Sequence, residues 1–334
     1  MMAFMTTTPS LESLGARCAR WLGTSCKATL SYALKRRSSL RMVQALLASL
    51  GEGKQAKRGE LIAVDSMPLT LPATRQHNCR KINRTTVGGA ILWTFRLRAP
   101  RGANPVNILK IISGPWHDTQ TIADIALEPR GPIYLMDRGF WSIGLIRQWL
   151  SQQVHFILRV NKQDFTYEML ALRGPRRPAP NGATILCDGE AKLGGPQRKN
   201  KPTVRLVIAV LADGTDLILA SDRFSASAEE LLAAYKQRWQ IEQYHRFLKD
   251  PIGLAHLYSF HETGIFFLAH VAVLLALLLF LGATASRATT IEIMHQAFEA
   301  LRRSIGEGTR WKRNISNRLV YGKGKRRRKR AKNH

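Results

Sequence analysis

Two carboxylates follow short apolar runs of the sequence. Asp65 ends the run Leu-Ile-Ala-Val-Asp that begins at Leu61, and Asp137 ends the run Pro-Ile-Tyr-Leu-Met-Asp that begins at Pro132. Short apolar runs are typical of buried strands, and ligand sites of α/β sheets form at the carboxyl ends of strands. An aspartate at a strand end also commonly starts a turn or caps a helix, so either residue alone is compatible with both roles.

A third acidic residue lies within a basic stretch that has helical character. Tyr235, Arg238, Glu242 and Lys249 are separated by 3, 4 and 7 positions. On a helix they fall within an arc of roughly 60°, on one side. Such a stripe can be a solvated row of i, i+4 ion pairs. It also suits a phosphodiester site, in which the glutamate binds a cation and the basic groups bind phosphates.

The charge balance of the whole chain indicates a polyanionic partner. The 334 residues include 51 Lys and Arg and 23 Asp and Glu, which gives a formal net charge of +28 at pH 7. Hydrophobic residues make up 45% of the chain, which is enough for a core and excludes a disordered polyelectrolyte. Nucleic acid is the usual partner of so basic a protein.

The segments around the two aspartates predict a mixed sheet. Five strands are expected, at residues 61–65, 86–97, 106–112, 132–137 and 154–160. Helical spacing occurs at residues 117–127 and 142–152. The order is therefore three strands, a helix, a strand, a helix and a strand, which predicts an α/β fold.

Local signals delimit the helix that carries the stripe. Ser227 and Glu230 form a capping box at its start, and Pro251 ends it, so one helix is expected to continue to Asp250. The side of this helix opposite the stripe is apolar and is expected to pack on a core through Ile241, Tyr244 and Leu248.

The same patterns divide the chain into five regions. We expect a basic helical region at 1–59, the first part of the core at 60–160, a β-rich insertion at 161–222, the glutamate helix with a core-packing helix at 223–285, and a C-terminal helix with a basic tail at 286–334. The insertion is expected to contain a β-hairpin over 203–221. The apolar segment 265–283 could span a bilayer by its length, but burial against the sheet is expected, because His270 interrupts it and the flanking chain is basic.

Several of these motifs resemble those of a known family. The Y-x-x-R-W-x-I-E-x-x-H-x-x-x-K stretch that begins at Tyr235 is similar to the Y-R-E-K signature of DDE transposases of the insertion sequence four family. The fragment Asp-Arg-Gly-Phe from Asp137 resembles the second-aspartate motif of that family, and the run from Leu61 resembles the first. The pair His117–Asp118 also matches, and the likeness covers about residues 60–280.

The resemblance implies a ribonuclease H-like core that has a β insertion between the second aspartate and the glutamate. It also implies cleavage and transfer of DNA strands with two Mg²⁺ ions, for which Mn²⁺ can substitute. Asp65 would bridge the two ions, and Asp137 and Glu242 would lie on either side. In-line displacement at phosphorus uses metal ions in this way, and carboxylate oxygens are the ligands that Mg²⁺ prefers.

The basic residues receive a role by the same resemblance. Tyr235, Arg238 and Lys249 would contact phosphates near the cleaved transposon end, and Arg138 and Arg246 would join them. The expected partners are the inverted-repeat ends of the element and target DNA. A homodimer is expected in the synaptic complex, and no membrane association is expected.

Two alternatives remain open. The first is a ribonuclease H-like nuclease that cuts DNA without strand transfer. The second is a non-catalytic basic nucleic-acid-binding protein or a decayed transposase, for which salt-sensitive binding without metal-dependent cleavage is expected. His245 is a weaker candidate for a metal ligand than the carboxylates, because no Cys/His partner set accompanies it.

The four cysteines are scattered and have no paired spacing, so neither a disulfide framework nor a zinc knuckle is expected. The N-terminus lacks the basic and apolar segments of a secretory signal. These features predict a cytoplasmic, nucleoid-associated protein.

Overall fold

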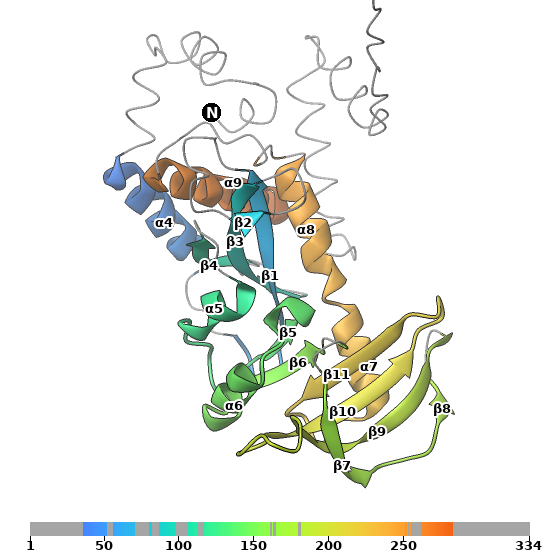
Figure 1. Ribbon diagram of the computed structural model, residues 1–334. Coiled ribbons are helices and arrows are strands. Elements are labelled where there is room, and N and C mark those ends of the chain that lie inside the picture. Colours follow the sequence, from blue (N-terminus) through green and yellow to red (C-terminus); the bar gives the residue numbers. More distant parts are fainter. Residues whose placement is uncertain are drawn as a thin grey trace, which may run out of the picture.

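The described residues form one mixed sheet of eleven strands with helices packed against it (Figure 1). The computed structural model describes residues 36–51, 56–70, 80–81, 87–97, 106–112, 117–160, 162, 165–179, 182–250, 252, 254 and 262–282. The strands pair in the order β2-β3-β1-β5-β6-β11-β10-β9-β7, while β4 pairs with β3 and β8 with β9. The predicted α/β class is confirmed. The predictions for residues 1–35 and 286–334 lie outside the described residues.

Six strands form the part of the sheet that contains both aspartates. They are β1 (Leu61–Thr70), β2 (Arg80–Lys81), β3 (Val87–Arg96), β4 (Val106–Ile112), β5 (Ile133–Met136) and β6 (His155–Arg159). β1 pairs with β3 antiparallel and with β5 parallel, and β5 pairs with β6 parallel. The helices between these strands make the parallel crossovers possible.

The remaining strands extend the same sheet. They are β7 (Tyr167–Leu172), β8 (Arg177–Pro178), β9 (Thr184–Leu193), β10 (Thr203–Val210) and β11 (Asp216–Ser221). β10 and β11 are antiparallel partners, so the predicted hairpin is confirmed. β11 joins this group to the core, because Leu219 lies opposite Arg159 of β6 in an antiparallel pairing.

Six α-helices and one short 3₁₀ helix are described. They are α4 (Arg37–Gly51), α5 (Asp118–Ala123), η2 (Arg138–Phe140), α6 (Ile143–Ser151), α7 (Ala228–Lys236), α8 (Trp239–Lys249) and α9 (Glu262–Gly282). The capping box is confirmed: the Glu230 backbone N–H donates to Ser227 Oγ at 3.1 Å, and the Ser227 N–H donates to Glu230 Oε2 at 2.8 Å.

The prediction of one helix up to Asp250 is wrong, because a tightened turn separates α7 from α8. The backbone N–H of Gln237 donates to the Ala234 carbonyl at 3.1 Å, and that of Arg238 donates to the Tyr235 carbonyl at 3.0 Å. These bonds span three residues, as in a 3₁₀ helix, rather than four. Arg238 therefore lies at the junction of two helices.

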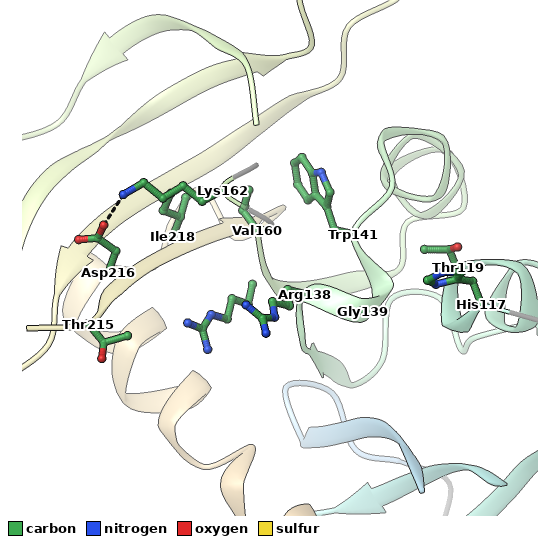
Figure 2. Close-up of a pocket in the computed structure, with 11 residues that line it drawn as sticks. His117, Thr119, Arg138, Gly139, Trp141, Val160, Lys162, Thr215, Asp216 and Ile218 are labelled. Carbon is green, nitrogen blue, oxygen red and sulfur yellow. Dashed lines mark hydrogen bonds and ion pairs between the residues drawn. The ribbon is translucent and has the colours of Figure 1, made fainter. Parts of the chain in front are cut away.

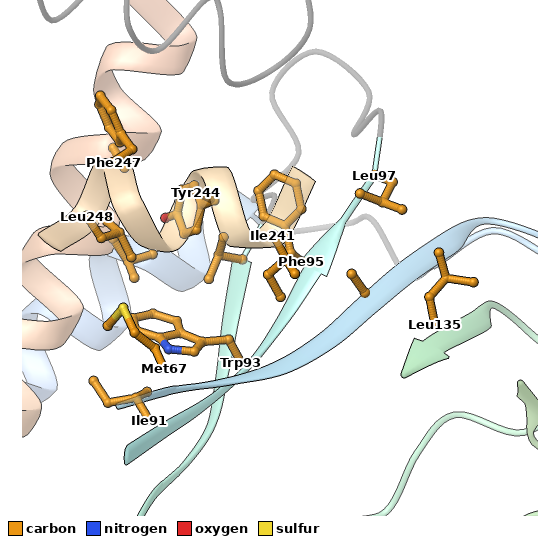
Figure 3. Close-up of a cluster of buried hydrophobic side chains, with 14 of the residues drawn as sticks. Met67, Ile91, Trp93, Phe95, Leu97, Leu135, Ile241, Tyr244, Phe247 and Leu248 are labelled. Carbon is orange, nitrogen blue, oxygen red and sulfur yellow. The ribbon is translucent and has the colours of Figure 1, made fainter. Parts of the chain in front are cut away.

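One face of the sheet packs against α4, α8 and α9. Figure 3 shows Trp93 and Phe95 of β3 beside Ile241, Tyr244 and Leu248 of α8. The last three side chains are 1% exposed or less, which confirms the predicted apolar side of the glutamate helix. Burial of each such side chain stabilises the fold by about 1.5–3 kcal/mol, so α8 is held firmly against the sheet.

The apolar helix α9 contributes to the same core. Nearly all its described side chains are buried, among them Leu268, Ala272 and Leu275, and it lies along α4 (Figure 1). The expected burial of this segment is confirmed. Of the helices in the described part of the chain, none has the length and apolar character that crossing a membrane requires.

The other face of the sheet packs against α5 and α6. Ile62 and Val64 of β1 lie in this second core with Trp149 of α6, whereas Ala63 and Met67 lie in the first. This alternation follows from the two-residue repeat of a strand. The sheet therefore has a core on each side, and the parity of a residue decides which helices it faces.

Candidate active site

The pairing of β1 with β5 brings the two aspartates together. Val64 of β1 lies opposite Met136 of β5 at the last position of this parallel pairing. Asp65 and Asp137 directly follow these two residues, so they lie side by side. The sequence predicted that Asp65 ends its strand, and this prediction is wrong. β1 continues to Thr70, where it pairs with β3 alone. Asp65 does lie where the parallel pairing ends, which is the position at which α/β sheets form sites.

The alternation of side chains along β1 and β5 directs both aspartates toward the face of the sheet that α8 covers. Asp65 is two residues after Ala63, and Asp137 is two residues after Leu135. Ala63 and Leu135 both belong to the core that contains α8. Asp137 also caps η2, since its Oδ1 accepts a hydrogen bond of 2.8 Å from the Gly139 backbone N–H. The cap orients this carboxylate at the end of β5.

Arg238 connects the glutamate to the first aspartate. Its Nη2 donates to Glu242 Oε1 at 2.5 Å, and its Nη1 lies 3.8 Å from Asp65 Oδ2. The side chains of Arg238 and Asp65 are 13% and 16% exposed, so solvent screens their pair only weakly, whereas Glu242 is 40% exposed and its pair with Arg238 is more open to solvent. The structure thus brings Asp65, Arg238 and Glu242 to one place between β1 and α8.

The surroundings raise the pKa of Asp65 to about 7. Burial is the largest cause, and the charges of Asp137 and Glu242 act in the same direction. Arg238 and the hydrogen bond of 2.9 Å from the Ser66 backbone N–H oppose this shift. Crowded carboxylates raise each other's pKa because their charges repel, so this shift places all three acids within one electrostatic cluster.

His245 lies beside the cluster, and reasoning from the sequence gave it no part there beyond that of a weak metal ligand. Its Nδ1 is 3.7 Å from Asp65 Oδ2, and its ring centroid is 6.3 Å from that of Trp93. Burial, together with the charges of Lys249 and Arg238, lowers the pKa of His245 to about 3, so the ring is neutral at pH 7. Its position three residues after Glu242, on the same side of α8, is the signal that could have placed it near the site.

Tyr235 and Lys249, the first and last residues of the stripe, lie on different helices. Tyr235 is 7% exposed at the end of α7, and the Arg238 guanidinium is 5.8 Å from its ring centroid. Burial raises the pKa of this phenol to about 12. Lys249 ends α8, where burial lowers its pKa while the charges of Asp250 and Asp65 raise it. The whole stripe thus borders the carboxylates despite the turn within it.

A basic cavity opens beside Asp137. It has a volume of about 980 Å³, and its lining includes the cations Arg138, Arg159 and Lys162. Figure 2 shows that its walls come from the start of α5, the turn after β5, the end of β6 and the β10–β11 hairpin. Lys162 forms an ion pair of 2.6 Å with Asp216, and Trp141 lines the cavity near Arg138 (Figure 2).

A second cavity, of about 400 Å³, lies on the α7 side of the site. Tyr235, Arg238 and Trp239 contribute to its lining, and Arg159 lines both cavities. Trp239 is 52% exposed. Arg159 therefore marks the place where the two cavities adjoin, and it is a basic site residue that the sequence patterns did not single out.

The carboxylates do not form a ready-made metal site. In the part of the chain that the structure describes, no three Asp, Glu, His or Cys side chains are grouped closely enough to hold an ion. Arg238 instead supplies positive charge between Asp65 and Glu242. The chemistry of the donors nevertheless fits a hard divalent cation, because all three are carboxylates and the charges of Asp137 and Glu242 act on Asp65.

The arrangement is that of the ribonuclease H-like class. Two aspartates at the end of adjacent parallel strands face a helix with a glutamate, and β3, β1, β5 and β6 are neighbours in a mixed sheet. A family model described as the transposase DDE domain matches residues 57–279, and the chain belongs to that family.

Two relatives carry provisional transposase names. A transposase for the insertion sequence element IS5377 of Geobacillus stearothermophilus is 25% identical over 146 residues, which are 43% of this chain and 38% of that protein. The transposase y4zB of Sinorhizobium fredii is 24% identical over 184 residues, which are 54% of this chain and 51% of that protein. The chain therefore spans about half or less of the length of these relatives. The narrower resemblance to the insertion sequence four family stays a prediction.

Proposed function

We propose that this protein cuts DNA at the ends of an insertion element and joins the freed 3′-hydroxyl to target DNA. The observation that carries the proposal is that Arg238 pairs with both Asp65 and Glu242, while the charge of Asp137 acts on Asp65 from the adjacent strand end. The matching family model and the transposase names of the relatives support the same activity.

The proposed catalytic residues are the three carboxylates, which would hold two Mg²⁺ ions or Mn²⁺ in their place. Bound cations of this kind activate the attacking oxygen and stabilise the leaving oxygen in phosphoryl transfer. Asp65 would be the central ligand of the three, because the charges of both Asp137 and Glu242 raise its pKa. The neighbouring core packing of α8 would keep Glu242 in position.

The proposed phosphate-binding residues surround the carboxylates. Tyr235, Arg238 and Lys249 border them from α7 and α8, and Arg138 lines the cavity beside Asp137. Arg138 and Arg159 line this cavity, and their guanidinium groups would bind DNA phosphates in a bidentate way.

The wider assignments belong to the same proposal. The DNA ends would be the inverted repeats of the element, a homodimer would hold them together, and the protein would be cytoplasmic and associated with the nucleoid. The division at residues 59, 160, 222 and 285 into end regions, core and β insertion is also proposed. The continuous pairing of β11 with β6 would fix the insertion to the core.

The test is an assay of strand cleavage and joining. The full chain, DNA that carries the terminal repeats of its element, a target plasmid and Mg²⁺ are mixed, and the products are separated on a gel. We expect joined products from the wild type and a loss of about 1000-fold in rate, equal to about 4 kcal/mol in the barrier, for Asp65→Asn, Asp137→Asn and Glu242→Gln.

Glu168→Gln is the matched control, because Glu168 is a largely exposed acid of β7 that pairs with Lys201 at 3.5 Å. It should retain wild-type activity. Cleavage without joined products would identify a nuclease instead. Metal-independent binding without cleavage would identify a non-catalytic DNA-binding protein, and full activity of all three carboxylate variants would refute the assignment of the site.

A further inference from the structure

Arg238 supplies the positive charge nearest to two of the three carboxylates. Each of its terminal nitrogens faces a different acid: Nη2 donates to Glu242 at 2.5 Å, and Nη1 lies 3.8 Å from Asp65. His245 lies 3.7 Å from Asp65 Oδ2, and Lys249 also borders this carboxylate, but neither contacts two of the three acids in the described part of the chain as Arg238 does. Arg238 therefore does most to balance the negative charge that Asp65, Asp137 and Glu242 concentrate here.

A divalent cation bound by the same carboxylates would change this balance. It would lie close to the guanidinium, and two like charges a few ångströms apart in a partly buried site repel each other strongly. The carboxylate oxygens that pair with Arg238 are also among those that a cation would use. Arg238 and the cation thus compete for the same acceptors.

The Arg238 side chain also borders open space. It lines the cavity of about 400 Å³ together with Tyr235 and Trp239. Its Nε is buried and has no hydrogen-bond partner among the described residues, so one donor of the guanidinium remains unused. Arg238 lies at the tightened turn between α7 and α8 rather than in the interior of either helix.

We propose that the Arg238 guanidinium balances the charges of Asp65 and Glu242 in the metal-free protein and leaves these carboxylates when a metal ion binds to them. The guanidinium, displaced from Asp65 and Glu242, then binds a DNA phosphate in the adjoining cavity. This exchange rests on the proposed function, since it assumes that the carboxylates hold a metal. It makes Arg238 a switch that couples the two ligands of the protein.

Coupling of this kind is reciprocal. A cation that releases Arg238 raises the affinity for DNA, and DNA that attracts Arg238 raises the affinity for the cation by the same factor. The metal-free site, held by an internal ion pair, is the weak-binding state for both ligands. The cation therefore binds most tightly when DNA is already in place.

The test measures Mn²⁺ binding to the full chain without DNA, by titration calorimetry at pH 8, where Asp65 is ionised. We expect Arg238→Gln to bind Mn²⁺ about tenfold more tightly than the wild type, because the internal competitor is gone. If Arg238 only oriented Glu242, its replacement would weaken Mn²⁺ binding. Arg147→Gln is the matched control, because it removes the same charge from an exposed position of α6; it should change the affinity less than about twofold.

The proposal is overturned if Arg238→Gln unfolds at the wild-type temperature but binds Mn²⁺ as the wild type does or more weakly. If this variant does not fold, Arg238→Met, which keeps an unbranched side chain, is measured against the same two outcomes. Asp65→Asn separates the exchange from the site itself. Loss of Mn²⁺ binding in Asp65→Asn without a gain in Arg238→Gln refutes the exchange alone, whereas unchanged binding in Asp65→Asn refutes the metal site.

Discussion

At the scale of single residues, the site is built on opposed charges held out of water. Asp65 is only 16% exposed and has Asp137 and Glu242 as acidic neighbours and Arg238 as its cationic one. Its raised pKa means that the folded, metal-free protein prefers the protonated carboxyl group. A site that disfavours its own charge in this way favours the entry of a cation, and the binding of that cation must release a proton near neutral pH.

The pKa of Asp65 predicts a pH-dependent cost of folding. In the unfolded chain the pKa is near 3.8, and in the folded protein it is about 7, so the free energy of unfolding falls as the pH rises between these values. The full penalty is present above pH 7 and absent below about pH 4.

Asp65→Asn should therefore stabilise the metal-free protein at pH 8, by at most about 4 kcal/mol, and this gain should shrink as the pH is lowered. Urea unfolding at several pH values in the presence of a chelator measures the difference. Lower stability of Asp65→Asn at pH 8 would contradict this explanation of the shift.

At the scale of elements, helices α7 and α8 are positioned by different parts of the chain. α8 packs on β1 and β3 through buried side chains such as Tyr244, whose ring centroid is 4.9 Å from that of Phe95. The start of α7 is tied to the insertion strands, because Arg177 of β8 donates to Glu229 of α7 at 2.8 Å and to Asp188 of β9 at 2.9 Å. The stripe is thus supported from the core and from the insertion.

The buried part of this ionic network predicts a large effect on stability. Asp188 and Arg205 are each 3% exposed in their side chains and pair at 2.6 Å. Asp188→Ala should cost about 3–5 kcal/mol, because it leaves the Arg205 charge buried and unpaired. Asp216→Ala, which breaks the exposed pair with Lys162, is the control and should cost less than about 1 kcal/mol. Equal losses in urea unfolding would show that burial does not decide the effect.

The elements that could be predicted from the sequence are those with local signals. Apolar runs predict β5 and β6, and the Ser227–Glu230 box predicts the start of α7, because these patterns are contained in a few neighbouring residues. The extension of β1 through Pro68 could not be predicted, since proline usually argues against a central strand. It is tolerated because β5 ends at Met136, so only β3 pairs with β1 there.

Two further features could not be predicted from the sequence. They are the turn between α7 and α8 and the contact of His245 with Asp65. Gln237 and Arg238 keep helical backbone angles, so no Gly or Pro marks the turn. The proximity of His245 to Asp65 depends on how α8 docks on β1, which is a contact between residues far apart in the sequence. The three carboxylates and the stripe could be predicted from the sequence, because their residue types and spacing do not depend on how α8 packs on β1.

At the scale of the whole molecule, three distant segments converge on one site within a strongly basic chain. The net charge of +28 draws a polyanion to the surface, and the cations Arg138 and Arg159 line one cavity beside the carboxylates. The three acids, from β1, the end of β5 and α8, then provide a local negative centre that a phosphodiester would not approach without cations. The proposed cleavage of DNA therefore depends on metal binding by these three acids.

The most direct test counts the Mn²⁺ ions bound to the full chain at pH 8, by electron paramagnetic resonance of the free ion. We expect two bound ions for the wild type and for Glu168→Gln. We expect the loss of at least one ion for each of Asp65→Asn, Asp137→Asn and Glu242→Gln. Wild-type binding by all three of these variants would contradict the proposed metal site.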